Sequence, residues 1–379
     1  MTLGIDASNA RSGGITNYLV QLISHLRPNV YGFDRIIIWA ADDLLDNISN
    51  HDWLEKKSSK YFSKSTLVKN YWRRYLLSKQ LKEECCDVLY VPGGIYTGTF
   101  RPFVTCCMNM LPFEKAEYMR YSWCSGWRWK MILLKISHLR TFTRANGIIY
   151  LSKYAQSYIT STYDITTSSQ IIHFGADEEL FFDIKEQRSI ELYSKENPFK
   201  ILYISPVAAY KHQDILASAV AKLILDGVHI ELILCGSANY RRIADKVAKI
   251  RNQNEATKAG IVSMGFVSSS KLRELRESAD AYAFSSSCEN MPTILIEYMS
   301  GGRPIMCSSK GPMPEFLGNE GYYYDPTSID ATSKALIEMI NDVDNRRVKI
   351  ENAQSLARGY SWQDCADQTL ELLSKKVKS

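Results

Sequence analysis

The fold of this 379-residue chain is decided by residues 285–309, which read SSSCENMPTILIEYMSGGRPIMCSS. Glu289 stands just before a short apolar run, Pro292 is expected to open a helix, and Glu297 lies eight residues after Glu289. Proline is tolerated at the first helical position because its missing N–H has no intrahelical partner there in any case. The helix is therefore predicted to begin near Met291 or Pro292.

The spacing of the two glutamates predicts a site for an anion with hydroxyl groups on both sides. If both residues were helical they would lie roughly 80° apart, on different faces, so Glu289 is assigned to the loop. A helix N-terminus carries about half a positive charge and binds phosphate readily. Eight helical residues span about 12 Å, which suits a sugar joined through a diphosphate to a ribose. The alternative is a surface-loop glutamate followed by a solvent-facing one on an amphipathic helix.

The composition is that of a soluble globular protein with two domains. The chain is too long for one ordinary core, and 45% of its residues are hydrophobic and 23% charged. No apolar run is long enough to predict a membrane span, and the start, MTLGIDASNA, lacks the pattern of a signal segment. We therefore expect a cytoplasmic protein, and its nine cysteines, which lack zinc-ligand spacing, are expected to be reduced thiols.

Runs rich in Ile, Val and Tyr alternate with helical segments in both halves, which predicts parallel sheets with helices on both sides. The expected strands lie at residues 2–7, 35–40, 87–91, 103–107, 147–151, 170–174, 200–205, 230–235, 260–264 and 281–284. One strand-turn-helix unit ends in Cys235-Gly236-Ser237, as in a mononucleotide-binding half. No Gly-x-Gly-x-x-Gly is present, which argues against a nicotinamide dehydrogenase.

The Glu-x7-Glu motif, followed by Gly301-Gly302-Arg303-Pro304 and by Gly311-Pro312-Met313-Pro314-Glu315, resembles the donor-site signature of retaining glycosyltransferases of family 4. The resemblance implies an α/β protein of the GT-B fold: two Rossmann-like domains with parallel sheets facing across a cleft, and a C-terminal helix that crosses back to the N-terminal domain. The expected parts are an acceptor-binding domain (1–178), a linker (179–197), a nucleotide-sugar donor domain (198–360) and the returning helix (361–379).

The resemblance also assigns roles to single residues. Glu289 and Lys211 are expected to be catalytic, with Lys211 neutralising the leaving diphosphate, although an exposed loop lysine is the simpler interpretation. Asn109 is expected to hydrogen-bond a sugar hydroxyl. The expected donor-binding residues are Glu297, Gly13, Gly14, Gly236, Asn290, Met291 and Thr293.

Two positions depart from the family pattern. Ser205-Pro206 stands where Gly-Arg is usual, so one phosphate-binding cation is missing, and Met108-Asn109 replaces a His-Asp pair. The family needs no protein nucleophile. No metal and no cofactor besides the donor are expected, and Asp342-Val343-Asp344 is interpreted as a solvated turn.

Two basic segments without acidic residues, 56–82 and 118–144, are interleaved with aromatic residues. Basic residues near anionic lipid contribute about 1 kcal/mol each, and aromatic rings favour the headgroup region. We expect these segments to bind the inner membrane surface, with an apolar face made by Trp123, Trp127, Met131 and Leu134. A partly buried domain helix with a solvated loop is the alternative. A nucleic-acid surface is not expected, because no nucleic-acid motif accompanies the segments.

These observations predict a metal-independent, retaining hexosyltransferase at the cytoplasmic membrane face. It would move a hexose from a UDP- or GDP-sugar to a lipid-linked oligosaccharide, as in O-antigen or capsule assembly. Two alternatives stay open: a non-catalytic scaffold of the same fold that binds a partner glycosyltransferase, and a sugar-nucleotide epimerase.

Overall fold

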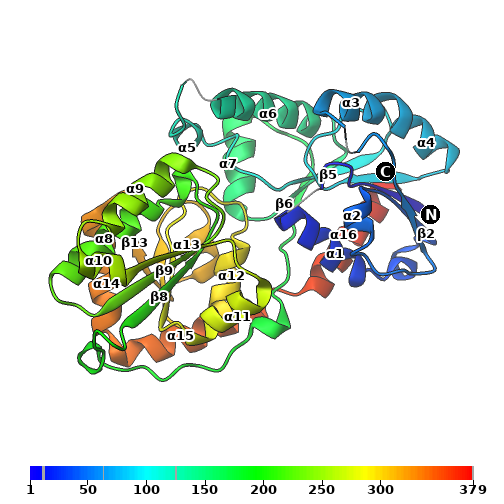
Figure 1. Cartoon of the computed structure of the whole chain (residues 1–379). Helices are drawn as coiled ribbons and strands as arrows, with labels where there is room; N and C mark the ends of the chain where they lie inside the picture. Colours follow the sequence, from blue (N-terminus) through cyan, green and yellow to red (C-terminus); the bar gives the residue numbers. More distant parts are fainter. Residues whose placement is uncertain (11–12, 63, 124–125, 378–379) are drawn as a thin grey trace. The chain divides into compact units, whose positions relative to one another are not determined.

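A computed structural model describes residues 1–10, 13–62, 64–123 and 126–377. Its contacts divide the chain into two compact units, each an α/β unit with helices on both faces of a parallel sheet (Figure 1). The first unit comprises Met1–Phe113, Gly126–Gly175 and Tyr360–Ser379, and the second comprises Glu114–Ser125 and Ala176–Gly359.

The sheet of the first unit has the strand order β3-β2-β1-β4-β5-β6-β7, and every neighbouring pair is parallel. Its strands are β1 (Thr2–Asp6), β2 (Arg35–Trp39), β3 (Leu54–Lys57), β4 (Val88–Val91), β5 (Phe103–Cys107), β6 (Gly147–Tyr150) and β7 (Ser169–Ile171). The edge strand β3 was not predicted, because its sequence LEKK is half-exposed and carries no apolar run. The other strands lie within a few residues of their predicted positions.

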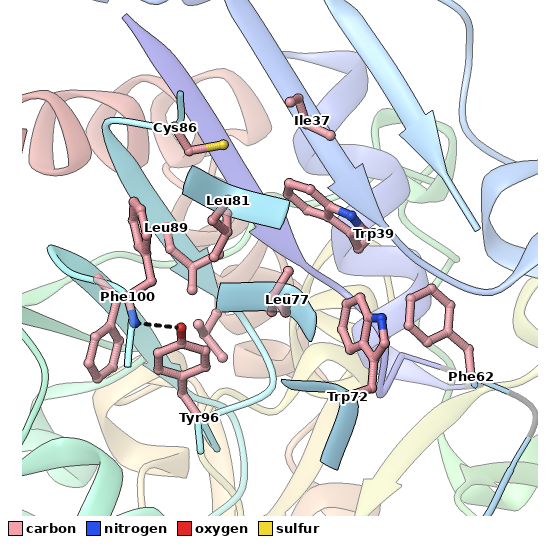
Figure 2. Packing of buried hydrophobic residues seen from close by; sticks show 12 residues of the cluster. Ile37, Trp39, Phe62, Trp72, Leu77, Leu81, Cys86, Leu89, Tyr96 and Phe100 are labelled. Carbon is pink, nitrogen blue, oxygen red and sulfur yellow. Dashed lines mark hydrogen bonds between the residues drawn. The ribbon is translucent and has the colours of Figure 1, made fainter. Parts of the chain in front are cut away.

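The helices of the first unit bury one face against this sheet. They are α1 (Gly14–Ser24), α2 (Asp42–Leu45), α3 (Thr66–Tyr71), α4 (Ser78–Glu83), α6 (Gly126–Phe142), α7 (Lys153–Tyr163) and α16 (Trp362–Val377), with a π-helical turn η2 (Trp72–Leu77) and a 3-10 turn η1 (Pro28–Tyr31). Figure 2 shows the core beneath η2 and α4, where Trp72 meets the ring of Phe62 edge-on at 4.6 Å between centroids.

Helix α16 packs in the first unit although the residues before Tyr360 belong to the second. Trp362 stacks on Phe174 with ring centroids 5.7 Å apart, and Asp367 forms an ion pair with Arg27. The returning C-terminal helix implied by the family resemblance is therefore present.

The sheet of the second unit has the order β10-β9-β8-β11-β12-β13, again parallel throughout. Its strands are β8 (Phe199–Ile204), β9 (Ile230–Cys235), β10 (Ile261–Gly265), β11 (Ala281–Phe284), β12 (Ile305–Ser308) and β13 (Gly321–Tyr324). The chain leaves β8 toward one edge and later returns to β11 on its other side. The β8–β11 pair is therefore the topological switch point, where ligands of open α/β sheets bind at the carboxyl ends of the strands.

The helices of the second unit form two groups, one containing α8, α9, α10 and α14 and the other α12, α13 and α15 (Figure 1). Their bounds are α5 (Lys115–Tyr118), α8 (Gln213–Leu225), α9 (Arg241–Arg251), α10 (Glu255–Gly260), α11 (Ser269–Ser278), α12 (Thr293–Ser300), α13 (Met313–Leu317), α14 (Ile329–Asn341) and α15 (Val343–Arg358), with 3-10 turns η3 (Glu178–Leu180), η4 (Ile190–Leu192) and η5 (Ala209–Lys211).

Candidate functional site

Two oppositely charged side chains meet at the switch point of the second sheet. Lys211 ends the turn that follows β8, and Glu289 lies in the loop that follows β11. The Lys211 ammonium and the Glu289 carboxylate form an ion pair in which both side chains are mostly buried. The two residues were predicted from separate motifs and lie 78 positions apart in the sequence, and the fold brings their side chains into contact.

The surrounding backbone holds this pair in place. The hydroxyl of Tyr203, on β8, donates a 2.8 Å hydrogen bond to the carbonyl of Lys211, and the N–H of Ser287 donates to the carbonyl of Tyr210 at 2.9 Å. The Lys211 ammonium also lies 5.6 Å from the ring centroid of Phe284, at the end of β11. The two loops are therefore hydrogen-bonded to each other and anchored on adjacent strands.

Gly236 permits a close approach of two neighbouring strand ends. It has φ +144°, and a Cβ at this position would lie 2.1 Å from the carbonyl oxygen of Ser205. Its N–H donates to the carbonyl of Gly265, at the end of β10, over 2.8 Å. A larger residue would force these strand ends apart, so the glycine keeps the carboxyl ends of β8, β9 and β10 close together.

The Glu-x7-Glu segment folds largely as its sequence predicts. Glu289 is in the loop, as expected, and helix α12 begins at Thr293, so that Pro292 caps the helix instead of opening it. Of the three neighbouring residues expected to bind the donor, Asn290 and Met291 are buried and Thr293 is exposed.

Glu297 is a partly buried carboxylate with a cationic partner. Its carboxylate forms an ion pair with Arg276, at the end of α11. Burial raises the pKa of Glu297 to about 7, while Arg276 acts in the opposite direction. The side chain keeps 23% of its surface exposed, so a ligand hydroxyl can still reach it.

The remaining predicted residues lie in the first unit. Asn109 follows β5, and its side-chain oxygen accepts a 3.0 Å hydrogen bond from the N–H of Leu111. Gly13 has φ +76° and precedes α1, which begins at Gly14.

Several polar residues around this site were not predicted: Arg276, Glu117, Ser287 and His212. Glu117 comes from α5, and its carboxylate accepts hydrogen bonds from Arg120 and Ser287. Beside it lies a pocket of about 220 Å³ lined by Arg120, His212, Asp214, Tyr240, Arg242, Lys246 and others. Glu117 and Ser287 are 170 positions apart, and no sequence motif relates residues at that separation. Their contact could therefore be identified only from the structure.

The structure revises the prediction for the two basic segments. Phe62, Trp72 and Arg73 are buried, and Arg73 pairs with Asp6 at 2.9 Å. Met131, expected on the exposed apolar face of the second segment, points into the core instead.

The apolar residues that α6 does expose are Trp127, Trp129, Leu133 and Ile136. They lie among the exposed cations Lys130 and Arg140. Of the predicted apolar face, Trp123 and Trp127 are exposed and Leu134 is half-buried. Met131 was assigned wrongly, because it belongs to the buried stripe of α6 with Arg128 and His138.

The described residues contain neither a cluster of metal ligands nor a membrane-spanning helix. Nowhere in residues 1–10, 13–62, 64–123 and 126–377 do three His, Cys, Asp or Glu side chains gather as metal ligands. Within the same ranges no helix combines the length and apolar character needed to cross a bilayer.

Asp342, of the Asp-x-Asp sequence, accepts a 2.9 Å hydrogen bond from the hydroxyl of Tyr322. None of the eight described cysteines forms a disulfide bond, and Cys124 lies outside the described residues.

Sequence comparisons show that most of the second unit is similar to known glycosyltransferases. Residues 184–356 match the family described as glycosyl transferases group 1. The O-antigen chain mannosyltransferase B of Escherichia coli is 26% identical over 265 residues, which cover 70% of this chain and 66% of that protein. A match to an uncharacterised glycosyltransferase of Methanocaldococcus jannaschii covers 50% of that relative. The chain thus matches between half and two thirds of the length of these relatives.

Structural comparisons cover the whole chain. A glycosyltransferase from Rickettsia africae has a TM-score of 0.71 at 16% identity, with 100% of this chain and 99% of that chain aligned. Anabaena HepE, in complex with UDP and glucose, has a TM-score of 0.67 at 18% identity, over 99% and 100% of the two chains. The predicted fold class, two Rossmann-like α/β domains as in GT-B glycosyltransferases, is confirmed.

Proposed function

We propose that this chain, whose residues 184–356 match the group 1 glycosyl transferases, transfers a hexose from a UDP- or GDP-sugar with retention of configuration. One observation carries the proposal: Lys211 and Glu289 meet at the carboxyl ends of β8 and β11, at the switch point of the matched unit. The Lys211 ammonium would neutralise the leaving diphosphate, and Glu289 would orient both the lysine and the donor sugar. Glu297 would accept hydrogen bonds from the ribose, eight residues further along.

The residues present suit a donor bound without a metal. A cation beside the phosphates replaces the charge that a metal ion would supply. The arginine that family members carry at Pro206 is missing, but Arg251 lines a pocket of about 160 Å³ together with Ser205 and Gly236. For Asn109, Gly13 and Gly14, which belong to the first unit, the proposed roles rest on the family resemblance.

A binding panel tests the donor proposal. UDP, GDP and their sugars are titrated by calorimetry, and turnover is followed as nucleotide release in the presence of candidate acceptors. We expect Glu297→Ala to weaken donor binding and Lys211→Ala chiefly to lower turnover. Donor binding without turnover by any acceptor would favour a scaffold, and reaction of the donor without an acceptor would favour an epimerase.

The acceptor is proposed to be a lipid-linked oligosaccharide of the O-antigen or capsule type. The support is the relative from E. coli, which is named as an O-antigen chain mannosyltransferase, together with the exposed surface of α6. That surface presents Trp129, Leu133 and Ile136 next to Lys130 and Arg140. A second exposed stripe, Tyr71, Arg74, Tyr75 and Lys79, lies on α3, η2 and α4.

Both stripes combine exposed aromatic or aliphatic residues with cations, which is the composition that binds anionic bilayer surfaces. The protein would then act as a peripheral protein at the cytoplasmic face. Vesicles of phosphatidylcholine with and without 30% phosphatidylglycerol test this by co-sedimentation. We expect binding to the anionic vesicles that weakens at high salt.

A matched pair of variants makes the membrane test specific. Leu133→Ser on α6 should weaken vesicle binding, whereas Leu225→Ser, at the end of α8, should not, although the two leucines are 65% and 58% exposed. Equal vesicle binding by both variants would contradict the assignment of this surface.

A further inference from the structure

The second unit contains a buried carboxylate from a segment that lies, in sequence, between β5 and α6 of the first unit. Residues Glu114–Ser125 follow β5 and precede α6 in sequence, yet they pack in the second unit. Their helix α5 carries Glu117, which is 6% exposed. A buried carboxylate needs hydrogen-bond donors and a compensating cation.

Glu117 has both. One carboxylate oxygen accepts a 2.7 Å hydrogen bond from Arg120 Nε, and the other accepts from Arg120 Nη2 at 3.2 Å. The oxygen that faces Arg120 Nε also lies 2.6 Å from Ser287 Oγ. Ser287 Oγ in turn lies 2.8 Å from His212 Nε2. All three members of this chain, Glu117, Ser287 and His212, are buried.

The direction of these hydrogen bonds follows from counting protons. An ionised carboxylate is an acceptor with no proton to give, so the single Ser287 hydroxyl proton goes to Glu117 at 2.6 Å and reaches the Tyr210 carbonyl, at 3.3 Å, only as a weaker second acceptor. Ser287 Oγ must then accept from His212, and the proton of the neutral imidazole therefore sits on Nε2. Burial lowers the pKa of His212 to about 4, with Arg120 adding to the effect, which agrees with a neutral ring.

The chain of hydrogen bonds touches both loops of the Lys211–Glu289 pair. His212 directly follows Lys211, and Ser287 precedes Glu289 by two residues. His212 has φ +50°, a left-handed conformation that a side chain of this kind seldom adopts without support. Its hydrogen bond to Ser287 holds it there, and it sets the direction in which the backbone presents Lys211.

We propose that Glu117 is a positioning residue for sugar transfer, which acts through Ser287 and His212 to fix the geometry of Lys211 and Glu289. The inference rests on the proposed function, because it concerns the residues that would handle the donor. The geometry of the donor site would then depend on α5, whose last residue, Tyr118, lies 66 residues before the family match at residues 184–356.

The test compares Ser287→Ala with Ser286→Ala. Ser286 is the neighbouring buried serine, and its hydroxyl donates to the carbonyl of Cys288 outside this network. We expect Ser287→Ala to lower kcat by about 10- to 100-fold, as displacement of reacting groups by about 1 Å does, with the donor KM changed less than threefold. Ser286→Ala should leave kcat within about twofold. Glu117→Gln keeps an oxygen for Ser287 and should lose less kcat than Glu117→Ala.

A second readout is independent of turnover. Nitrogen-15 NMR of histidine-labelled protein should show His212 as the neutral Nε2–H tautomer in the unmodified protein and a changed tautomer population in Ser287→Ala. An Nδ1–H tautomer in the unmodified protein, or equal kcat in Ser287→Ala and Ser286→Ala, would overturn the positioning role while leaving the proposed function intact. Absence of turnover with every donor would overturn the proposed function itself, and this inference with it.

Discussion

The raised pKa of Glu297 predicts a pH-dependent affinity for the sugar nucleotide. At a pKa of about 7, roughly one tenth of the carboxyl groups are ionised at pH 6 and nine tenths at pH 8. A hydrogen bond to a charged acceptor is about 1.4 kcal/mol stronger than one to a neutral acceptor, which is a factor of about ten in affinity. Weighted by the ionised fractions, donor affinity should rise about fivefold between pH 6 and pH 8.

Calorimetry with the tightest-binding UDP- or GDP-sugar measures this rise. The intact sugar nucleotide is the right ligand, because neither of its phosphates has the second ionisation near pH 6 that a terminal phosphate has. Glu297→Gln should remove the pH dependence. Arg276→Met should move the rise to higher pH, since Arg276 is the cation that lowers the pKa of Glu297.

A flat affinity between pH 6 and pH 8 in the unmodified protein would refute the role of Glu297 in donor binding. An unchanged midpoint in Arg276→Met would show that the ion pair does not govern the ionisation of Glu297.

Three further predictions concern stability. Gly236→Ala should lower the unfolding free energy by about 3 kcal/mol, through backbone strain and the clash with Ser205. Gly227→Ala, also at positive φ but with open space around it, should cost about 1 kcal/mol. Urea titration measures both losses, and equal losses would contradict the clash. Arg73→Met should cost about 3–5 kcal/mol by leaving Asp6 buried without its cation, and part of the loss in melting temperature should return in the double variant with Asp6→Asn. Burial lowers the pKa of His138 to about 4. The neutral side chain therefore contributes fully to the unfolding free energy above about pH 6.5, and up to about 3 kcal/mol is lost as the pH falls toward 4. His138→Gln should reduce the fall in the urea midpoint over this pH range.

Much of the fold is readable from the sequence because buried parallel strands are continuous apolar runs. The strands at 103–107, 230–235 and 281–284 were predicted to the residue. β3 was not predicted because this edge strand has no such run, and the edge strand β13 (Gly321–Tyr324) was not predicted either. Met131 was assigned to the exposed face of α6 because apolar residues surround this helix, so that the sequence does not reveal which of them the core buries.

The candidate site was predictable where a motif is local and unpredictable where it depends on tertiary contacts. Glu289, Glu297 and Lys211 stand in recognisable positions relative to strands and helix starts. Arg276 and Glu117, their supporting residues, belong to helices whose sequences look like ordinary charged surface helices. Their roles arise from burial beside a carboxylate or a serine on another element, which a linear pattern does not encode.

The route of the chain limits how this protein can be recombined. Residues Glu114–Ser125 and the C-terminal helix α16 each fold with the unit that lies elsewhere in sequence. A single splice near residue 175 would thus strip the first unit of a helix that buries Leu370 and Leu373, and would deprive the second unit of Glu117. A chimera that exchanges the donor domain between relatives must instead replace two separate segments together, residues 114–125 and residues 176–359.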